Sequence, residues 1–489
     1  MAFDLVLFGG TGDLAWRKLM PSLLRAFRHG RLAPDGRILA VARDELSDDG
    51  YRQWLRERLA QVDDADVDDD AWTRFARRVC YRRVDLAQRH DYARLRDWLE
   101  TPDERGAVAE DVVLYLATSP HLFPAICAHL GAAGLNSPHM RVVLEKPLGR
   151  DLASAQQINR AVAAAFSEAQ AFRIDHYLGK SAVQNLMALR FGNVLFEPLW
   201  RRESVASIQI TLAEAIGVGT RGDFYDRTGA LRDMVQNHAL QLLTMIAMEP
   251  PAHHRSDAIR DEKLKVLQAL KPFTEDGARR DVVRGQYRAG VAEGRAVPGY
   301  LDEAQVPAGS RCETFVALRT EVQNWRWAGV PFYLRTGKRL AARDAHIVVN
   351  FRATPHSIFP GVHRANKLVI KLQPEDGLEL HLLAARGGPG ERETLAPVCL
   401  DLDFEKTFAA HRVGAYERLL IDALDGRLNL FVRSDEQEQA WRWVEPVLDA
   451  WQRDDEDGGG PRPYAAGSWG PAAASALIAR DGQAWAEEQ

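Results

Sequence analysis

The pattern of hydrophobic residues changes partway along the chain. In the first part these residues form short unbroken runs, at 3–8, 37–42, 112–117 and 141–144. Unbroken apolar runs are typical of strands that are buried on both faces of a parallel sheet. Charged stretches with helical periodicity separate the runs at 47–108, and another helical stretch follows the last run at about 151–168. The pattern predicts an α/β domain with a parallel sheet.

In the remainder of the chain, hydrophobic and polar residues alternate. The alternating runs lie at 204–212, 314–322, 346–351, 367–372 and 378–383. Alternation with a period of two predicts strands of an antiparallel sheet with two unlike faces. Helical segments at 231–248 and 416–424 interrupt these runs, and 454–470, rich in glycine, proline and aspartate, is expected to be a loop. We therefore predict two domains, a parallel α/β domain at 1–176 and an α+β domain with a large antiparallel sheet at 177–489.

A glycine-rich turn, Gly9-Gly10-Thr11-Gly12-Asp13-Leu14, follows the first apolar run. A strand, a glycine turn and a helix in this order favour dinucleotide binding, because backbone N–H groups approach the pyrophosphate at the positive end of the helix. The spacing departs from G-x-G-x-x-G, since Ala15 occupies the third glycine position. Arg43 ends the second run, where an arginine suits the 2′-phosphate of NADP and an acid suits NAD. Arg43 therefore predicts NADP as the cofactor. Asp44 and Glu45 follow directly and would oppose a 2′-phosphate, so NAD remains open as a second cofactor.

Two further residues are expected at the same edge of the parallel sheet. Ligands of such sheets bind beyond the carboxyl ends of the strands. Thr118 follows the third apolar run and Lys146 follows the fourth. Both should therefore face the same ligand as the glycine turn. Pro147 comes directly after Lys146, and the sequence leaves the isomer of this peptide bond open.

The segment Arg173-Ile174-Asp175-His176-Tyr177-Leu178-Gly179-Lys180 has the highest density of chemically active groups. A carboxylate, an imidazole, a phenol and two cations suit the wall of a pocket that binds an anionic, hydroxyl-rich ligand and moves a proton within it. A solvated loop is the alternative for this segment taken alone. Three clusters further along the chain carry similar groups: Glu214, the segment Asp233-Met234-Val235-Gln236-Asn237-His238, and the basic turn from Phe332 to Arg339 that includes Lys338.

Two of these later clusters also have a structural explanation. His238 lies beside the apolar face of a predicted helix, where a histidine is commonly a hydrogen-bonded core residue. The basic turn at 332–339 is of a kind that is commonly plain surface. The clusters by themselves therefore do not decide between a site and a structural role.

Composition narrows the class of protein. The chain has 489 residues, 46% of them hydrophobic and 27% charged, with a net charge of -5. This balance gives no reason to expect nucleic acid or a membrane surface as a partner. The four cysteines have no paired spacing, which predicts reduced thiols in a cytoplasmic protein without a metal site. No basic and apolar leader precedes the first strand, and no apolar run approaches the length of about 18 residues that predicts a membrane span.

Taken together, these motifs resemble those of the glucose-6-phosphate dehydrogenase family. The resemblance covers nearly the whole length and rests on five motifs in order: the glycine turn with Lys18, Glu145-Lys146-Pro147, the segment from Arg173 to Lys180, Arg232 to His238, and Arg335-Thr336-Gly337-Lys338. It implies oxidation of D-glucose 6-phosphate at C1 to 6-phospho-D-glucono-1,5-lactone, the first step of the oxidative pentose phosphate pathway. It also implies NADP as cofactor and no metal.

The resemblance implies a role for each matching residue. His238 is the general base, and Asp175 is the carboxylate that orients it. The substrate phosphate is held by His176, Tyr177 and Lys180. The remaining substrate contacts are Lys146, which lies between sugar and nicotinamide, then Glu214, Asp233, Lys338 and Arg343, with Gln373 as a looser match.

The resemblance further implies a Rossmann-type domain and a second domain whose large antiparallel sheet forms a homodimer, or a homotetramer in some relatives. Two departures lie at the cofactor end. Asp44 follows Arg43, and Trp16 stands where relatives often have a basic residue. They bear on the choice of cofactor and leave the reaction unchanged.

Two alternatives remain from the sequence. One is another two-domain sugar dehydrogenase, of the glucose–fructose oxidoreductase and inositol dehydrogenase type, which shares the Glu-Lys-Pro triplet but does not require the His176-Tyr177…Lys180 cluster. The other is a non-catalytic NADP-binding protein. The presence of Asp175, His238 and Lys146 argues against the second alternative.

Overall fold

The computed structural model of the chain describes residues 2–62, 68–102, 106, 108–360, 364–386, 394–407 and 413–488. The chain divides into two compact units. Unit 1 comprises Met1–Gly179, His253–Arg260 and Val413–Glu438, and unit 2 comprises Lys180–Ala252, Asp261–Arg412 and Gln439–Gln489. Each unit is organised around its own sheet.

Unit 1 contains a seven-stranded sheet in the order β17-β6-β5-β4-β1-β2-β3. All neighbours are parallel except β17, which pairs antiparallel with β6. The strands are β1 (Phe3–Phe8), β2 (Arg37–Ala42), β3 (Val79–Arg83), β4 (Asp111–Leu116), β5 (Met140–Leu144), β6 (Ala171–Ile174) and β17 (Phe431–Val432). The strand order reverses at β1, the arrangement that opens a ligand crevice beyond the carboxyl ends of the strands.

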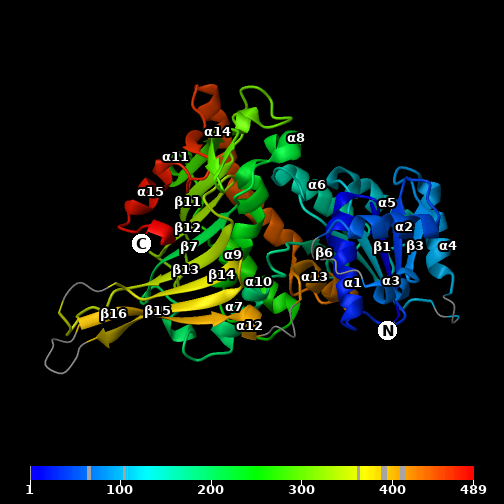
Figure 1. Ribbon diagram of the computed structural model, residues 1–489, viewed down its shortest axis with the longest axis horizontal. Helices are drawn as coiled ribbons and strands as arrows, with labels where there is room; N and C mark the ends of the chain where they lie inside the picture. Colours follow the sequence, from blue (N-terminus) through cyan, green and yellow to red (C-terminus); the bar gives the residue numbers. More distant parts are fainter. Residues whose placement is uncertain are drawn as a thin grey trace. The chain divides into compact units, whose positions relative to one another are not determined.

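Helices of unit 1 connect and cover these strands (Figure 1). They are η1 (Ala15–Leu19), α1 (Met20–Arg28), α2 (Asp48–Leu59), α3 (Asp69–Ala76), α4 (Arg89–Glu100), η2 (Pro120–Leu122), α5 (Phe123–Ala132), α6 (Leu152–Ala163), η3 (Glu168–Gln170) and α13 (Ala415–Leu424). The central strands are buried on both faces, as their unbroken apolar runs predict. Val6, Leu114 and Val142 are fully buried in one core cluster, and burial of each such side chain contributes about 1.5–3 kcal/mol.

Unit 2 contains a nine-stranded, mostly antiparallel sheet in the order β16-β15-β14-β13-β7-β12-β11-β8-β18. Only the β7–β12 and β8–β18 pairs among these neighbours are parallel. The strands are β7 (Val205–Ala213), β8 (Val282–Arg288), β11 (Phe315–Glu321), β12 (Pro331–Gly337), β13 (Asp344–Phe351), β14 (Lys367–Gln373), β15 (Gly377–Arg386), β16 (Thr394–Asp403) and β18 (Arg462–Ala465), with a separate hairpin of β9 (Gly290–Ala292) and β10 (Arg295–Val297). The predicted fold class, a parallel α/β domain followed by a domain with a large antiparallel sheet, is confirmed.

The alternation along β7 shows how the two faces of this sheet differ. Ile208, Ile210 and Leu212 lie on one face and are buried, because successive side chains of a strand point to opposite faces. On the other face, Ser207 Oγ donates to Gln483 and the Gln209 amide donates to the carbonyl of Ala484. The C-terminal segment therefore satisfies the polar groups of this face.

The helices of unit 2 include α7 (Ser181–Phe191), η4 (Glu197–Leu199), η5 (Gly219–Arg221), α8 (Gly222–Asp226), η6 (Leu231–Ala239), α9 (Leu240–Ala247), α11 (Glu275–Asp281), η7 (Tyr300–Asp302), α12 (Phe404–Thr407), α15 (Ala472–Ala479) and η9 (Ala486–Glu488). Two longer helices, α10 (Ser256–Gln268) and α14 (Ser434–Glu456), begin in the segments assigned to unit 1 and continue in unit 2. A search of the described helices found none long and apolar enough to cross a membrane.

Two local predictions were wrong. The segment 454–470 is not a simple loop, since α14 runs to Glu456 and Arg462–Ala465 forms β18 at the edge of the sheet. The stretch 47–108 is not only helical, because it contains β3. β3 and β18 are short edge strands, and β3 ends in two exposed arginines. Such strands lack the apolar run or alternation that predicts the central ones. The sequence analysis also did not predict β6, β8 and β16.

Candidate active site

The glycine turn after β1 has no room for a side chain at two of its positions. Gly9 has a φ of +84°, and a Cβ atom there would lie 2.6 Å from the carbonyl oxygen of Ala117. A Cβ on Gly10 would lie 2.6 Å from the Ala40 Cβ. Glycine is therefore required at both positions, because it lets the turn pack closely against β2 and the end of β4. At the end of β4, the buried hydroxyl of Thr118 has no hydrogen-bond partner among the described residues, which fits a group that a bound cofactor would satisfy.

Lys146 stands beside a buried carboxylate that the sequence did not identify. The Glu145 side chain is buried, and the Tyr115 hydroxyl donates a hydrogen bond to it at 2.5 Å. Burial raises the pKa of Glu145 to about 7, although the Tyr115 hydrogen bond and the Lys146 charge act in the opposite direction. The Lys146–Pro147 peptide bond, whose isomer the sequence left open, is cis. Tyr115 lies on β4 and Glu145 follows β5, so parallel pairing of two strands brings together groups that lie 30 residues apart.

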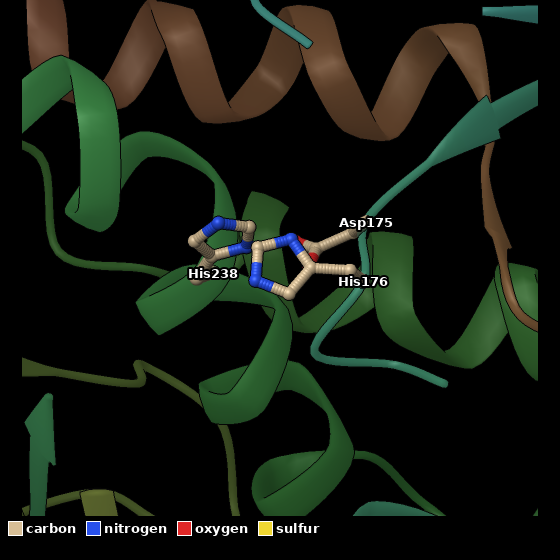
Figure 2. Close-up of side chains that lie close together, drawn as sticks. All are labelled: Asp175, His176 and His238. Atoms are coloured by element: carbon tan, nitrogen blue, oxygen red, sulfur yellow. The ribbon is translucent and has the colours of Figure 1, made fainter. Parts of the chain in front are cut away.

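The segment after β6 forms a tight turn that is largely buried. Figure 2 shows Asp175 and His176 on the chain as it leaves this strand. One carboxylate oxygen of Asp175 accepts a hydrogen bond from the Tyr177 backbone N–H at 2.9 Å, which fixes the carboxylate within the turn. The His176 ring stacks on Tyr416 of α13, with ring centroids 6.0 Å apart and planes within 10°. Tyr416 is a contact that the sequence analysis missed, because 240 residues separate the two rings (416 − 176).

Not every cation of this segment belongs to a binding site. Arg173 is buried, and its guanidinium donates hydrogen bonds to Glu168 at 2.7 Å and to Asn159 at 3.1 Å. Arg335 in the later basic turn is likewise buried, pairs with Glu487 and lies 4.2 Å from the centre of the Trp485 ring. Both arginines therefore hold the fold together.

Lys180, at the start of α7, belongs to a group of cations in unit 2. Its ammonium donates to the carbonyl of Leu372 at 3.2 Å. When the Gln373 amide presents its oxygen, that oxygen accepts from Arg343 at 2.8 Å and from Lys180 at 3.2 Å. The pKa of Lys180 is lowered to about 8, chiefly by burial, while Asp376 raises the pKa and Arg343 lowers it. Two cations that converge on one amide oxygen form a ready anion-binding position.

Glu214 and Lys338 form a second polar pair in unit 2. They follow the parallel neighbours β7 and β12, and Lys338 Nζ lies 2.6 Å from the Glu214 carboxylate. Lys338 is buried, its Nζ lies 5.0 Å from the centre of the Tyr225 ring, and its carbonyl accepts from the Tyr464 hydroxyl at 2.6 Å. A carboxylate and an ammonium held this closely offer an acceptor and a donor to sugar hydroxyls.

His238 lies on the π-helix η6 (Figure 2). Asp233 lies five residues before it on the same helix. A π-helical turn is rare and is frequently found at functional sites. The histidine side chain is completely buried, whereas Asp233 is partly exposed. The apolar helical face that was predicted beside His238 is present, since Met234 and Val235 are buried on the same helix.

Glu313 fixes the beginning of this helix and was also missed by the sequence analysis. Its carboxylate accepts from the Leu231 backbone N–H at 3.0 Å, and its carbonyl accepts from the Ala230 N–H at 3.0 Å. A Cβ on Gly229, which has a φ of +73°, would lie 2.3 Å from the same carboxylate. Burial raises the pKa of Glu313. This single buried side chain therefore anchors the helix that carries His238.

One described group in unit 2 has the composition of a metal site. Donor atoms of Glu379, His381 and Cys399 lie within 4.8 Å of one another on β15 and β16. Glu379, however, is already paired with Lys371 on β14 and with His381 at 2.9 Å. These contacts neutralise the carboxylate without an ion.

Comparisons with known proteins cover the whole chain. Residues 6–185 match the family model described as "Glucose-6-phosphate dehydrogenase, NAD binding domain", and residues 187–486 match the model of the C-terminal domain. The "Glucose-6-phosphate 1-dehydrogenase" of Mycolicibacterium smegmatis is 50% identical over 487 residues, which cover 99% of this chain and 97% of the relative. The protein of the same name from Rhizobium meliloti is 46% identical, with the same coverage.

Solved structures give the same result. One described as "Glucose-6-phosphate dehydrogenase in complex with its substrate glucose-6-phosphate" has a TM-score of 0.90 and 34% identity, and the match covers 99% of this chain and 98% of that one. The glucose-6-phosphate 1-dehydrogenase of Mycobacterium avium has a TM-score of 0.83 and 36% identity, with 99% of each chain covered. The similarity in fold therefore extends through both units.

Proposed function

Because the chain belongs to the glucose-6-phosphate dehydrogenase family, we propose that the residues described above form the active site for oxidation of D-glucose 6-phosphate. The reaction converts the C1 hydroxyl of the sugar to 6-phospho-D-glucono-1,5-lactone and reduces NADP, as the first step of the oxidative pentose phosphate pathway. The observation that carries the assignment of substrate is the convergence of Lys180 and Arg343 on Gln373. A sugar without a phosphate would leave this cationic position without its anion.

The phosphate is held by charge and by hydrogen bonds. Lys180 and Arg343 supply the charge, and the phosphate takes the place of the Gln373 oxygen between them. His176 and Tyr177 add a ring nitrogen and a hydroxyl. Stacking on Tyr416 keeps the His176 ring in one orientation, so little side-chain entropy is lost when the phosphate binds.

His238 removes the proton of the C1 hydroxyl. As the hydride leaves C1, the O–H bond must release its proton, and a neutral imidazole is the efficient acceptor near neutral pH. Asp175, fixed by the Tyr177 backbone N–H, holds the imidazole in the required tautomer and stabilises the imidazolium that forms.

The sugar ring is oriented by groups that are already paired. Glu214 and Lys338 hold each other at 2.6 Å, so both are fixed before the substrate arrives. Asp233 contributes a second carboxylate from helix η6. Lys146 lies between the sugar and the nicotinamide, next to the buried Glu145.

The cofactor binds to unit 1. The glycine turn, Arg43, Thr118 and Lys146 are the residues that would hold it, and the glycine positions and the unsatisfied Thr118 hydroxyl fit a dinucleotide. When bound, NADP supplies the hydride acceptor, so the protein needs no nucleophile of its own for this step.

One assay tests the function directly. NADPH or NADH formation is followed at 340 nm with glucose 6-phosphate, glucose and 6-phosphogluconate, each with NADP and with NAD. We expect rapid turnover of glucose 6-phosphate alone. Comparable rates with free glucose would instead support the alternative sugar dehydrogenase, and no turnover of any sugar would support the non-catalytic alternative, although the full-length matches already favour the family.

We also propose that the chain forms a dimer, in which a second copy covers the outer part of the unit 2 sheet. Figure 1 shows β15 and β16 at the outer edge of that sheet. On β16, Val398, Leu400 and Leu402 are 40%, 60% and 43% exposed, and they pair with leucines of β15 on the same face. An exposed apolar face of this kind needs cover, and a symmetric dimer supplies it. Light scattering should give a dimer or a tetramer at micromolar concentration, and a monomer would contradict the proposal.

A further inference from the structure

The acidic residue after Arg43 contacts the glycine turn directly. The Thr11 hydroxyl donates to the Asp44 carboxylate at 2.8 Å. Thr11 belongs to the turn that follows β1, and Asp44 follows β2, the parallel neighbour of β1. The Asp44 carboxylate therefore lies at the edge where the adenosine ribose of a dinucleotide binds in such a sheet.

Two tyrosines keep this contact in place. The Tyr51 hydroxyl donates to the carbonyl of Gly10 at 2.7 Å, and the Tyr81 hydroxyl donates to the carbonyl of Asp44 at 2.7 Å. Their rings stack with centroids 5.0 Å apart. The turn and the Asp44 backbone are thus joined through one buried aromatic pair, which fixes the backbone positions from which the Thr11 and Asp44 side chains extend.

The neighbouring charges are arranged differently. The Glu45 carboxylate is paired with Arg83, so it is directed to another partner. The Arg43 guanidinium is exposed and has no hydrogen bond or ion pair with the described part of the chain. One cation and one carboxylate, Arg43 and Asp44, are consequently both available to the ribose end of the cofactor.

We propose that Asp44, held on the glycine turn by Thr11, is a cofactor-specificity residue through which this chain binds NAD as well as NADP. Its carboxylate accepts hydrogen bonds from the ribose hydroxyls of NAD. Toward NADP it acts in two unfavourable ways, because it repels the 2′-phosphate and occupies the Thr11 hydroxyl that could donate to it. Arg43 attracts the same phosphate, so the two effects oppose each other. The proposal rests on the assignment of the glycine turn as the cofactor site.

The test is a binding measurement without any sugar. Dissociation constants of NADP+ and NAD+ are measured by calorimetry for the full-length protein and for Asp44→Asn, which keeps the size and an acceptor oxygen but removes the charge. We expect Kd for NADP+ to fall at least about fivefold and Kd for NAD+ to rise at least about threefold. Glu45→Gln is the matched control, and it should change each Kd less than about twofold because Glu45 already pairs with Arg83.

A ratio of the two Kd values that changes by less than twofold in Asp44→Asn would overturn the proposal, as would an equal change in Glu45→Gln. Asp44→Ser, which keeps a hydroxyl beside Thr11, provides a second variant should Asp44→Asn not fold, with the same direction expected. Since no sugar is present, the result is independent of whether glucose 6-phosphate is the substrate. Failure of wild type to bind either cofactor would instead contradict the cofactor site itself.

Discussion

Replacement of Lys180 by arginine should change the alkaline limb of the pH–rate profile. Burial lowers the pKa of Lys180 from 10.5 to about 8, so in the free enzyme the ammonium is lost as the pH rises through about 8. The positive form is the one that binds the phosphate. It follows that, on the alkaline side of the profile, kcat/KM for glucose 6-phosphate should fall as the pH rises above about 8.

The size of the effect follows from the titration. With a pKa of about 8, roughly 3% of Lys180 is protonated at pH 9.5, which would reduce kcat/KM about 30-fold. The decrease in kcat/KM cannot exceed the contribution of the charged contact to binding, which is about 1.5–3 kcal/mol, or roughly 10- to 150-fold. We therefore expect wild type to lose about 10- to 30-fold between pH 7.5 and 9.5. Lys180→Arg keeps its charge throughout this range and should lose much less, whatever its activity at pH 7.5.

Asp376 offers a control on the same titration. Its negative charge raises the pKa of Lys180, so Asp376→Asn should shift the alkaline limb to lower pH. The profiles are measured as initial rates of NADPH formation at low sugar concentration, with saturating NADP. An identical alkaline limb in wild type and Lys180→Arg would refute the reasoning, because the group that titrates would then be a different one.

Three other substitutions address separate parts of the site. Arg43→Ala should raise KM for NADP about tenfold or more, the cost of a charge-assisted contact of about 1.5–3 kcal/mol, and should leave NAD kinetics nearly unchanged; equal losses with both cofactors would contradict the assignment. Asp175→Asn should reduce kcat severely, since an amide can hold the imidazole in the wrong tautomer, and a kcat close to wild type in stopped-flow assays would remove Asp175 from the mechanism. Glu313→Ala leaves the buried Leu231 N–H without its acceptor and should lower the free energy of unfolding by about 1–3 kcal/mol in urea titrations. Glu313→Gln keeps an acceptor oxygen and should lose less, so equal losses in the two variants would argue against the helix anchor.

The strands that were predicted combine continuous or alternating apolar residues with recognisable turns, whereas β6 and β8, which also lie inside the sheets, were not predicted. Phe3–Phe8 is buried on every residue, and β7 alternates in the polarity of its side chains, although nearly all of its residues are buried. The edge strands β3 and β18 were missed because partner strands, and not their own composition, determine that they pair. In physical terms, a short polar edge strand gains its hydrogen bonds only from a neighbour that the local sequence does not specify.

The candidate site was predictable as far as its motifs are local. The position of Lys338 beside Glu214 depends on two parallel strands separated by 124 residues, and family resemblance supplied the pair where spacing could not. Glu313 and Tyr416 were missed because each acts on another segment through tertiary packing. Arg173 was wrongly grouped with the chemically active residues of its segment. Its guanidinium pairs with Glu168 and stabilises the fold.

The most direct test of the mechanism is kcat of His238→Asn with saturating glucose 6-phosphate and NADP. Asparagine keeps much of the volume of the completely buried imidazole but cannot accept the C1 hydroxyl proton. We predict that kcat falls about 10²–10⁴-fold, whereas KM for glucose 6-phosphate changes much less because Lys180 and Arg343 remain. A His238→Asn enzyme that retains more than about a tenth of the wild-type kcat would contradict the account, and Lys146 would then be the first alternative base to examine.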